Sequence, residues 1–332
     1  MHMVREESRR KELIDVIIPA HQAEGTLARA LKSVHAQSAP IHQIFVVADA
    51  CTDQTAAIAT QLGASVLDVD FRSAGAARNH AIEMSKATWV AFLDADDSWE
   101  SSWIESVQRR MKEHQTADVY FGRIRECEEA NGHSKTVAVS PACDSQGDVF
   151  EQLFRANFIN TQAVVARRSA ILSAGGFAED IQQAEDLDLW LRMAASCSFH
   201  PVSGVHVTKY RYPHSLSRNP LYLDTMRENS LQVIGRAATL RPVSAETFRH
   251  AISEMYVQSS LRMLAAGRRC ESRADLKKAL KIRPGRVDGW AIAGFSILPT
   301  GVQENLLAVR SRLRPGLRLN RRKNTDVIEY NE

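Results

Sequence analysis

Short apolar runs alternate with amphipathic segments over the first part of the chain. The runs cover residues 15–19, 43–47, 65–69 and 89–93, and the segments between them that are predicted to be helical cover 26–37, 55–62 and 75–85. Near-continuous apolar runs separated by helices are typical of parallel strands that are buried on both faces. The pattern therefore predicts an open, mostly parallel α/β sheet flanked by helices.

The same alternation continues less regularly up to about residue 219. Helices are predicted at 103–114, 169–174 and 185–194, and strands at 119–124, 162–166 and 205–212. The polar stretch 126–148 is predicted to be a loop-like insert that is either flexible or shapes the acceptor side. From about residue 220 the pattern changes to helices only, interrupted by Pro242, Pro284 and Pro299. We therefore predict two domains, an α/β domain over 13–219 and an all-helical extension over 220–332.

Composition excludes several classes of protein. A formal net charge of +3 on 332 residues indicates no nucleic-acid partner. The five cysteines are odd in number and scattered, which argues against a disulfide framework or a zinc knuckle and favours a reducing cytoplasm. Residues 1–13 lack the apolar core of a secretory signal, and the uncharged run 289–303 is too short and mixed to span a bilayer. We expect a cytoplasmic protein, at most peripheral to a membrane.

The stretch WVAFLDADDSW places Asp94, Asp96 and Asp97 directly after the fourth apolar run. Like charges about 4 Å apart repel by roughly 4 kcal/mol at an effective dielectric constant near 20. Two interpretations follow, a solvated acidic turn before a helix, or a site for a divalent cation and a phosphate-bearing ligand. Ligands of open α/β sheets bind beyond the carboxyl ends of the strands, and Asp49 and Arg72 are predicted at the same edge.

Six stretches in order resemble family-two glycosyltransferases of the GT-A fold, which are inverting, nucleotide-sugar-dependent enzymes. The stretches are VIIPAHQAEGTLARALKSVHAQ, IFVVADACTDQT, RSAGAARNHAIEMSKATWVAFLDADD, ARRSAILSAGGFAED, AEDLDLWLR and KYRYPHSLS. Together they span about residues 13–218. Each is weak alone, but six in the family's order identify the fold and the class of donor, although not the sugar.

The resemblance implies a set of residues that bind the donor. Pro19, Ala20 and Glu24 would lie against the nucleotide, in the loop after the first strand. Asp49 would accept a hydrogen bond from the uracil-type N–H of the base, or else cap a turn. Arg72 would approach the diphosphate through charge-assisted hydrogen bonds, or else be a surface arginine.

The resemblance also implies a metal site in the DxD motif. Asp96 would bind Mg²⁺ or Mn²⁺, with Asp94 nearer the ribose and Asp97 in support. His214 matches a histidine that some relatives place beside the metal or the diphosphate. Carboxylate oxygens are the ligands that such hard cations prefer, so the residue types fit the chemistry.

The pair Glu185-Asp186 resembles the family's catalytic ED pair. Asp186 would be the general base that deprotonates the acceptor hydroxyl, with Glu185 the second candidate, and such a base contributes about 10²- to 10⁴-fold in rate. The alternative is that both acids only favour a helix N-terminus through its dipole. Arg78 and Asn79, which match the family's ARN, would pack and orient the site.

The last third carries no motif that we assign to chemistry. A basic, leucine-containing run over 306–323 predicts either a solvated helix and tail or a surface that touches anionic lipid. No recognised nucleic-acid module or aromatic interleaving accompanies it. The Q-x-x-R-W signature of processive relatives is absent after the ED pair, so we expect a single transfer per encounter.

The sequence therefore predicts a metal-dependent inverting glycosyltransferase. It would move a sugar from a nucleotide-sugar donor, with UDP as the expected nucleotide, to a saccharide, lipid-linked or other hydroxyl acceptor in polysaccharide, glycolipid or glycoside biosynthesis. Two alternatives stay open, a non-catalytic nucleotide-sugar-binding or scaffolding protein and a sugar nucleotidyltransferase. The latter is disfavoured because no glycine-rich, lysine-containing phosphate loop follows the first strand.

Overall fold

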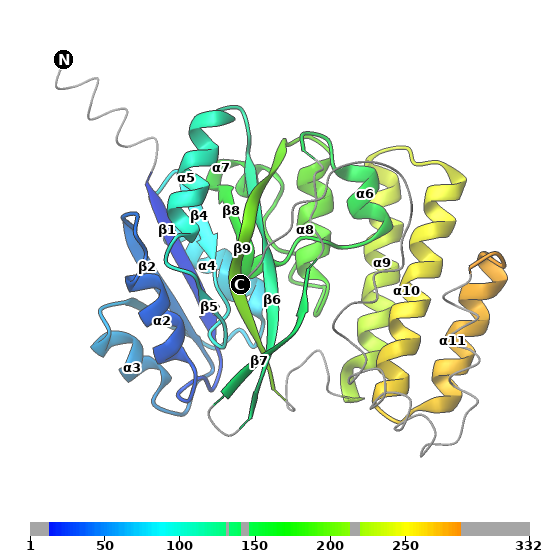
Figure 1. Ribbon diagram of the computed structural model, residues 1–332, viewed down its shortest axis with the longest axis horizontal. Coiled ribbons are helices and arrows are strands. Elements are labelled where there is room, and N and C mark those ends of the chain that lie inside the picture. The colour runs from blue at the N-terminus through cyan, green and yellow to red at the C-terminus, as the bar shows by residue number, and fades with distance from the viewer. Residues whose placement is uncertain (1–12, 131–132, 141–145, 213–219, 287–332) are drawn as a thin grey trace, which may run out of the picture.

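The computed structural model describes residues 13–130, 133–140, 146–212 and 220–286 (Figure 1). A twisted sheet with helices on both faces forms one part, and three long helices stand beside it. The strands are β1 Ile14–Ala20, β2 Gln43–Asp49, β3 Ser65–Val69, β4 Trp89–Phe92, β5 Ser98–Trp99, β6 Val119–Ala130, β7 His133–Val139, β8 Val164–Arg167 and β9 Phe199–Arg211. The helices are α2 Leu27–His35, α3 Thr55–Gln61, α4 Ala74–Met84, α5 Trp103–Glu113, α6 Phe150–Arg155, α7 Arg168–Ser173, α8 Glu185–Ala194, α9 Leu223–Leu240, α10 Ala245–Ala265 and α11 Arg269–Ile282, with short 3-10 turns at Thr161–Ala163 and Pro220–Tyr222.

The described strands form one sheet in the order β3-β2-β1-β4-β8-β6-β9-β5, with β7 paired to the outer part of β6. Strands β1 to β4 are all parallel, as the apolar runs predicted. Beyond β4 the sheet is mixed, because β8 runs antiparallel to both β4 and β6 while β9 runs parallel to β6. The α/β architecture is confirmed, although only its first half is a parallel sheet.

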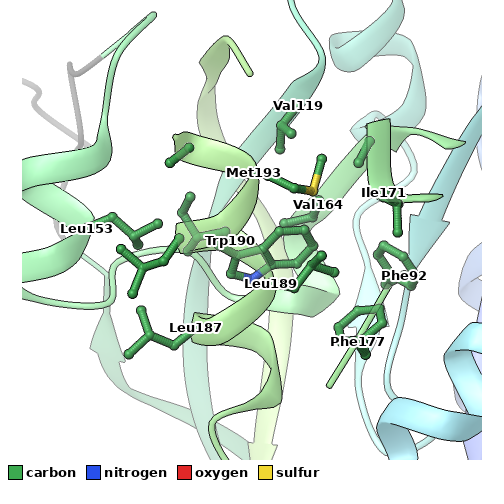
Figure 2. Packing of buried hydrophobic residues seen from close by; sticks show 14 of the residues in the cluster. Phe92, Val119, Leu153, Val164, Ile171, Phe177, Leu187, Leu189, Trp190 and Met193 are labelled. Carbon is green, nitrogen blue, oxygen red and sulfur yellow. The ribbon is translucent and has the colours of Figure 1, made fainter. Parts of the chain in front are cut away.

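Alternate residues of the strands fill two separate cores. Ile17 of β1 faces a core shared with α4, α7 and α8, while Val16 and Ile18 face a core shared with α2, α3 and α5. Figure 2 shows the first core, in which Phe92, Phe177 and Trp190 pack together with ring centroids 5.5–6.3 Å apart. A sheet covered on both faces leaves only its edges for ligands. The carboxyl ends of β1, β2 and β4 therefore meet at one accessible edge.

The segment predicted to be a polar loop over 126–148 is instead largely strand. Strand β6 continues to Ala130 and turns back as β7, and β9 runs along its other side. The prediction was wrong because this ribbon has charged rather than alternating apolar residues. Ion pairs across the strands, such as that of Arg211 with Glu126, take the place of apolar contacts.

The helical extension continues the core of the α/β part. Val233, Ile234 and Ala237 of α9 are almost completely buried and belong to the same hydrophobic cluster as Trp190 of α8. A smaller cluster joins α10 to α11. Among the described residues no helix combines the length and the apolar character needed to cross a bilayer. The basic run 306–323 lies outside the described residues.

Candidate active site

The acidic cluster consists of Asp94, Asp96 and Asp97 in the turn after β4. Asp97 is 1% exposed, and its Oδ1 accepts a hydrogen bond of 3.0 Å from the N–H of Tyr210, while its Oδ2 is buried without a partner. Burial, and then the charges of Asp94 and Asp96, raise the pKa of Asp97 well above its usual value. Burial and Asp94 likewise raise the pKa of Asp96. The turn is therefore not a fully solvated acidic turn, because Asp97 is almost completely buried and one of its oxygens has no hydrogen-bond partner.

Arg78 of α4 joins this cluster to the predicted base pair. Its guanidinium donates to Asp94 Oδ1 at 2.9 Å and to Glu185 Oε1 at 3.1 Å, and its side chain is only 6% exposed. Burial opposes the charge of Arg78, but the two carboxylates outweigh it and raise its pKa. Two motifs that lie about 90 residues apart in the sequence thus meet through one buried arginine.

Glu185 and Asp186 form the first turn of α8, as predicted. Both carboxylate oxygens of Glu185 have hydrogen-bond partners, because Oε1 accepts from Arg78 and Oε2 accepts from the N–H of Ala184 at 3.1 Å. Asp186 Oδ1 accepts from the N–H of Leu187 at 2.6 Å, and its Oδ2 has no partner among the described residues. Burial, followed by the charge of Glu185, raises the pKa of Asp186 to about 6. Asp186 is thus ionised at neutral pH and more basic than an ordinary carboxylate.

Two cations near the acidic cluster were missed at the level of sequence. Lys209 of β9 lies where the charges of Asp94, Asp97 and Asp96 outweigh its burial and raise its pKa. No hydrogen bond or ion pair of its ammonium group is present in the described part of the chain. Arg29 of α2 donates to the carbonyl oxygen of Asp96 at 3.0 Å and stacks on the ring of Tyr210, 3.6 Å from its centroid. Lys209 opens the KYRYPHSLS stretch, which was the only signal that could have drawn attention to it.

Asp49 ends β2 and organises the loop that precedes α4. Its Oδ1 accepts from the N–H groups of Phe71 and Arg72 at 2.6 and 2.7 Å, and its Oδ2 accepts from the N–H of Ser73 at 2.8 Å. The carboxylate is 4% exposed and both oxygens are used. The structure therefore favours the turn-capping alternative for Asp49. The hydrogen bond from the nucleotide base to Asp49 stays a prediction.

The other residues that were predicted to bind the nucleotide-sugar donor lie along the same edge of the sheet. Pro19 and Ala20 are the last residues of β1. Glu24 lies in the exposed loop after it, where Oε2 accepts from the N–H of Gln54 at 3.1 Å, at the start of α3. Arg72 is 76% exposed and pairs with Asp70 at 2.8 Å rather than with the acidic cluster. Their roles in binding stay predictions.

An open groove of about 480 Å³ lies beyond the ends of β2 and β3. Its lining residues are Ala50, Cys51, Thr52, Asp68, Val69, Asp70 and Arg72. The groove is next to the loop that Asp49 holds in place. Its position corresponds to the ligand-binding edge of an open α/β sheet.

Strained backbone is concentrated in the loops at this edge. Within the described residues, every non-glycine residue with a clearly positive φ lies in a loop beside the site: Gln22 (49°), Ala50 (51°), Arg72 (55°), Gln183 (63°) and Ala184 (137°). Such conformations cost of order 1–3 kcal/mol each and persist only where surrounding contacts enforce them. Side chains supply those contacts here, as in the three hydrogen bonds of Asp49.

Asn79 holds the backbone of a neighbouring loop, in line with its predicted role of packing and orienting the site. Its Oδ1 accepts from the N–H of Phe177 at 2.8 Å and its Nδ2 donates to the carbonyl of the same residue at 2.9 Å. Gly176, at φ 68°, must be a glycine because an added Cβ would come within 2.6 Å of Asn79 Oδ1. His214 lies outside the described residues, so its predicted place beside the metal is not part of this geometry.

The carboxylate oxygens of the acidic cluster supply some, but not all, of the ligands that a hard divalent cation needs. The buried, unpartnered Oδ2 of Asp97 and the neighbouring oxygens of Asp96 are the kind of ligands that Mg²⁺ and Mn²⁺ take. In the described part of the chain no three His, Cys, Asp or Glu side chains converge closely enough to hold a metal by themselves. A cation here would thus share its coordination with phosphate oxygens and water, as Mg²⁺ commonly does.

Comparison with known proteins agrees with this geometry. Residues 15–171 match the family described as Glycosyl transferase family 2. The chain is 33% identical over 118 residues to the putative teichuronic acid biosynthesis glycosyltransferase TuaG of Bacillus subtilis, covering 34% of this chain and 47% of TuaG. It is 25% identical over 318 residues to the succinoglycan biosynthesis protein ExoU of Rhizobium meliloti, covering 90% of this chain and 89% of ExoU. With several curated relatives, TuaG among them, the chain spans less than two thirds of their length.

The fold also matches a solved structure. S. aureus TarS 1–349 in complex with UDP superposes with a TM-score of 0.55 at 17% identity, covering 90% of this chain and 87% of that one. At this identity the likeness concerns the fold, and it confirms the expected GT-A architecture. Residues 15–171, which match the family, contain the acidic cluster, Arg78 and the loop that Asp49 holds. The chain therefore carries a glycosyl transferase family 2 domain over residues 15–171.

Proposed function

We propose that this protein is an inverting glycosyltransferase that moves a sugar from a nucleotide-sugar donor, with UDP as the nucleotide, to an acceptor hydroxyl. The observation that carries the proposal is the pair of hydrogen bonds by which Arg78 joins Asp94 of the DxD turn to Glu185, beside Asp186. Transfer needs a site for a diphosphate next to a base for the acceptor. One buried guanidinium would hold these two parts of the site next to each other.

The donor would lie along the carboxyl edge of the sheet. The groove beyond β2 and β3 offers room for the nucleoside, and the acidic cluster after β4 lies farther along the same edge. TarS, which shares the fold, has been solved in complex with UDP and with UDP-GlcNAc, and this supports a UDP-linked donor. Lys209 would hold the diphosphate as a point charge beside the acidic cluster.

Mg²⁺ or Mn²⁺ would bind the carboxylates of Asp96 and Asp97 together with the donor phosphates, with Asp94 held nearby by Arg78. When bound, the cation stabilises the negative charge of the leaving nucleoside diphosphate. The raised pKa values of Asp96 and Asp97 support this assignment, since a cation would relieve the burial and repulsion that cause them. His214 stays a candidate ligand from the sequence.

Asp186 would act as the general base. Its free Oδ2 accepts the proton of the acceptor hydroxyl while that oxygen forms a bond to the anomeric carbon and the bond from this carbon to the phosphate oxygen breaks. A single displacement of this kind inverts the anomeric configuration. A pKa of about 6 keeps Asp186 ionised near pH 7 and able to hold the proton as the bond forms.

The acceptor belongs to the biosynthesis of polysaccharides or glycolipids in this proposal. TuaG and ExoU are named for teichuronic acid and succinoglycan biosynthesis, and both relationships support such an acceptor. A cytoplasmic enzyme that meets a lipid-linked acceptor through its basic 306–323 run is consistent with the sequence.

Titration calorimetry with UDP, in the presence and absence of Mn²⁺, tests the donor site. We expect Mn²⁺ to tighten UDP binding, and Asp96→Ala to remove that effect because the cation loses its main ligand. Glu113→Ala, at an exposed and ion-paired position on α5, serves as the control and should bind as the unaltered protein does. UDP binding that is equally tight without Mn²⁺, or unchanged in Asp96→Ala, would overturn the metal assignment.

A further inference from the structure

The loop 177–184 delivers the candidate base to the site. It is the later part of the connection between α7 and α8 and ends in Gln183 and Ala184, which have φ values of 63° and 137°. Asp186 follows two residues later, in the first turn of α8. An L-residue does not stay at such φ values unless its neighbours enforce them. The position of Asp186 thus depends on what holds this loop.

The α/β domain holds the loop near its beginning. Asn79 makes its two hydrogen bonds to the backbone of Phe177, and Ile181 is 2% exposed within the core. These contacts end before the two strained residues. Of these two, Ala184 is held through its N–H by the side chain of Glu185, and the stretch 180–182 before them has a separate anchor.

The helical extension supplies that anchor through α9. Arg236 pairs with Asp180 through both of its terminal nitrogens, with Nη1 at 3.2 Å from Oδ1, and this hydrogen bonding lowers the pKa of Asp180. Asn229, two turns earlier on α9, donates a hydrogen bond to the carbonyl oxygen of Gln182. Both contacts bind the segment directly before Gln183.

The body of α9 is fixed to the same core as α8. Val233 and Ile234 lie between the two polar anchors in sequence and are almost completely buried in the cluster that includes Leu187. Figure 1 shows α9 beside α8. The helix is thus a rigid support for the loop.

We propose that α9 is a positioning element for the transfer reaction, in which Arg236 and Asn229 hold the loop 177–184 so that Asp186 keeps its orientation. The inference rests on the proposed role of Asp186 as the base. Neither residue touches the reacting atoms, so each acts only through the loop. The helical extension thereby becomes part of the catalytic unit.

The double variant Asn229→Ala/Arg236→Ala tests the proposal. We expect kcat to fall about tenfold, because small displacements of reacting groups are costly, while UDP affinity and the donor KM stay unchanged. We also expect the acidic limb of the kcat profile to move to lower pH. A loosened loop exposes Asp186 to more water and so lowers its pKa, although Glu185, Arg78 and Lys209 still act on it.

Arg241→Ala is the matched control. Arg241 follows α9, is 40% exposed like Arg236, and pairs with Asp148 of the α/β domain as Arg236 pairs with Asp180. It does not touch the loop, so its removal should leave kcat and the pH profile as they were. The exchanged pair Asp180→Arg/Arg236→Asp should recover most of the activity that Arg236→Ala loses.

Two results would overturn the proposal. One is a double variant with the kcat and pH profile of Arg241→Ala, and the other is a loss of UDP affinity in proportion to kcat. Asp186→Asn separates this proposal from the proposed function. If Asp186→Asn stops transfer while the double variant matches the control, Asp186 remains the general base and the proposed positioning role of α9 is wrong. If Asp186→Asn remains active, the assignment of the base fails, and the inference about α9 fails with it.

Discussion

Replacing Asp186 with asparagine should stabilise the folded protein at neutral pH. The pKa of Asp186 rises from an ordinary 3.8 to about 6 on folding, mainly because of burial. Each pKa step corresponds to about 1.36 kcal/mol, so the ionised side chain costs the folded state up to about 3 kcal/mol. The cost is absent well below pH 3.8, where the group is protonated in both states, grows as the pH rises between the two pKa values, and is complete above the folded pKa of about 6. Asp186→Asn removes this cost by removing the charge.

Urea unfolding at pH 4.5 and pH 7.5 measures this effect. The variant should gain about 1–3 kcal/mol in unfolding free energy at pH 7.5 and much less at pH 4.5, while its kcat falls about 10²- to 10⁴-fold. Asp148→Asn is a control of opposite sign, because its hydrogen bond with Arg241 lowers the pKa of Asp148. No gain in stability at pH 7.5, or a kcat within tenfold of the original, would refute the account of Asp186 as a partly buried, activated base.

Two further predictions concern the cations of the site. Arg78→Met should lower the unfolding free energy by about 3–5 kcal/mol in urea, since it leaves two partly buried carboxylates without their cation, and a loss below 1 kcal/mol would contradict the bridging role. Lys209→Met should weaken the binding of UDP about tenfold in calorimetry but leave that of uridine unchanged, because a bound diphosphate would lose one charge partner. Equal losses for both ligands would show that Lys209 acts on the fold, and Lys112→Met, on the exposed face of α5, is the control.

Local patterns sufficed to predict the first half of the fold. Strands β1, β2 and β4 are short, apolar and buried on both faces, so their hydrophobicity alone marks them, whereas β3 lies at the edge of the sheet and is only partly buried. The start of α8 at Glu185 was also predicted from its acidic residues and the apolar spacing that follows. The ribbon of β6 and β7 was missed because its residues are largely polar or charged and lack the apolar alternation of a half-buried strand.

Much of the site depends on the register of distant segments. Lys209 lies near the acidic cluster because β9 pairs with β5, at Ser98 and Thr208, just after the DxD turn. No local spacing reveals such a pairing. The proposed role of α9 was hidden for a similar reason, since the change of pattern near residue 220 gives no sign that Val233 and Ile234 share a hydrophobic cluster with Trp190.

The left-handed residues at the rim have a consequence for engineering. Replacing Gln22, Ala50 or Gln183 with glycine would relax the backbone at that position, and the folded chain would lose the energetic penalty that it now carries. A library screened only for heat resistance would therefore accumulate glycines in these loops. Such variants would resist denaturation better while their loops became too pliable to hold a ligand in one pose.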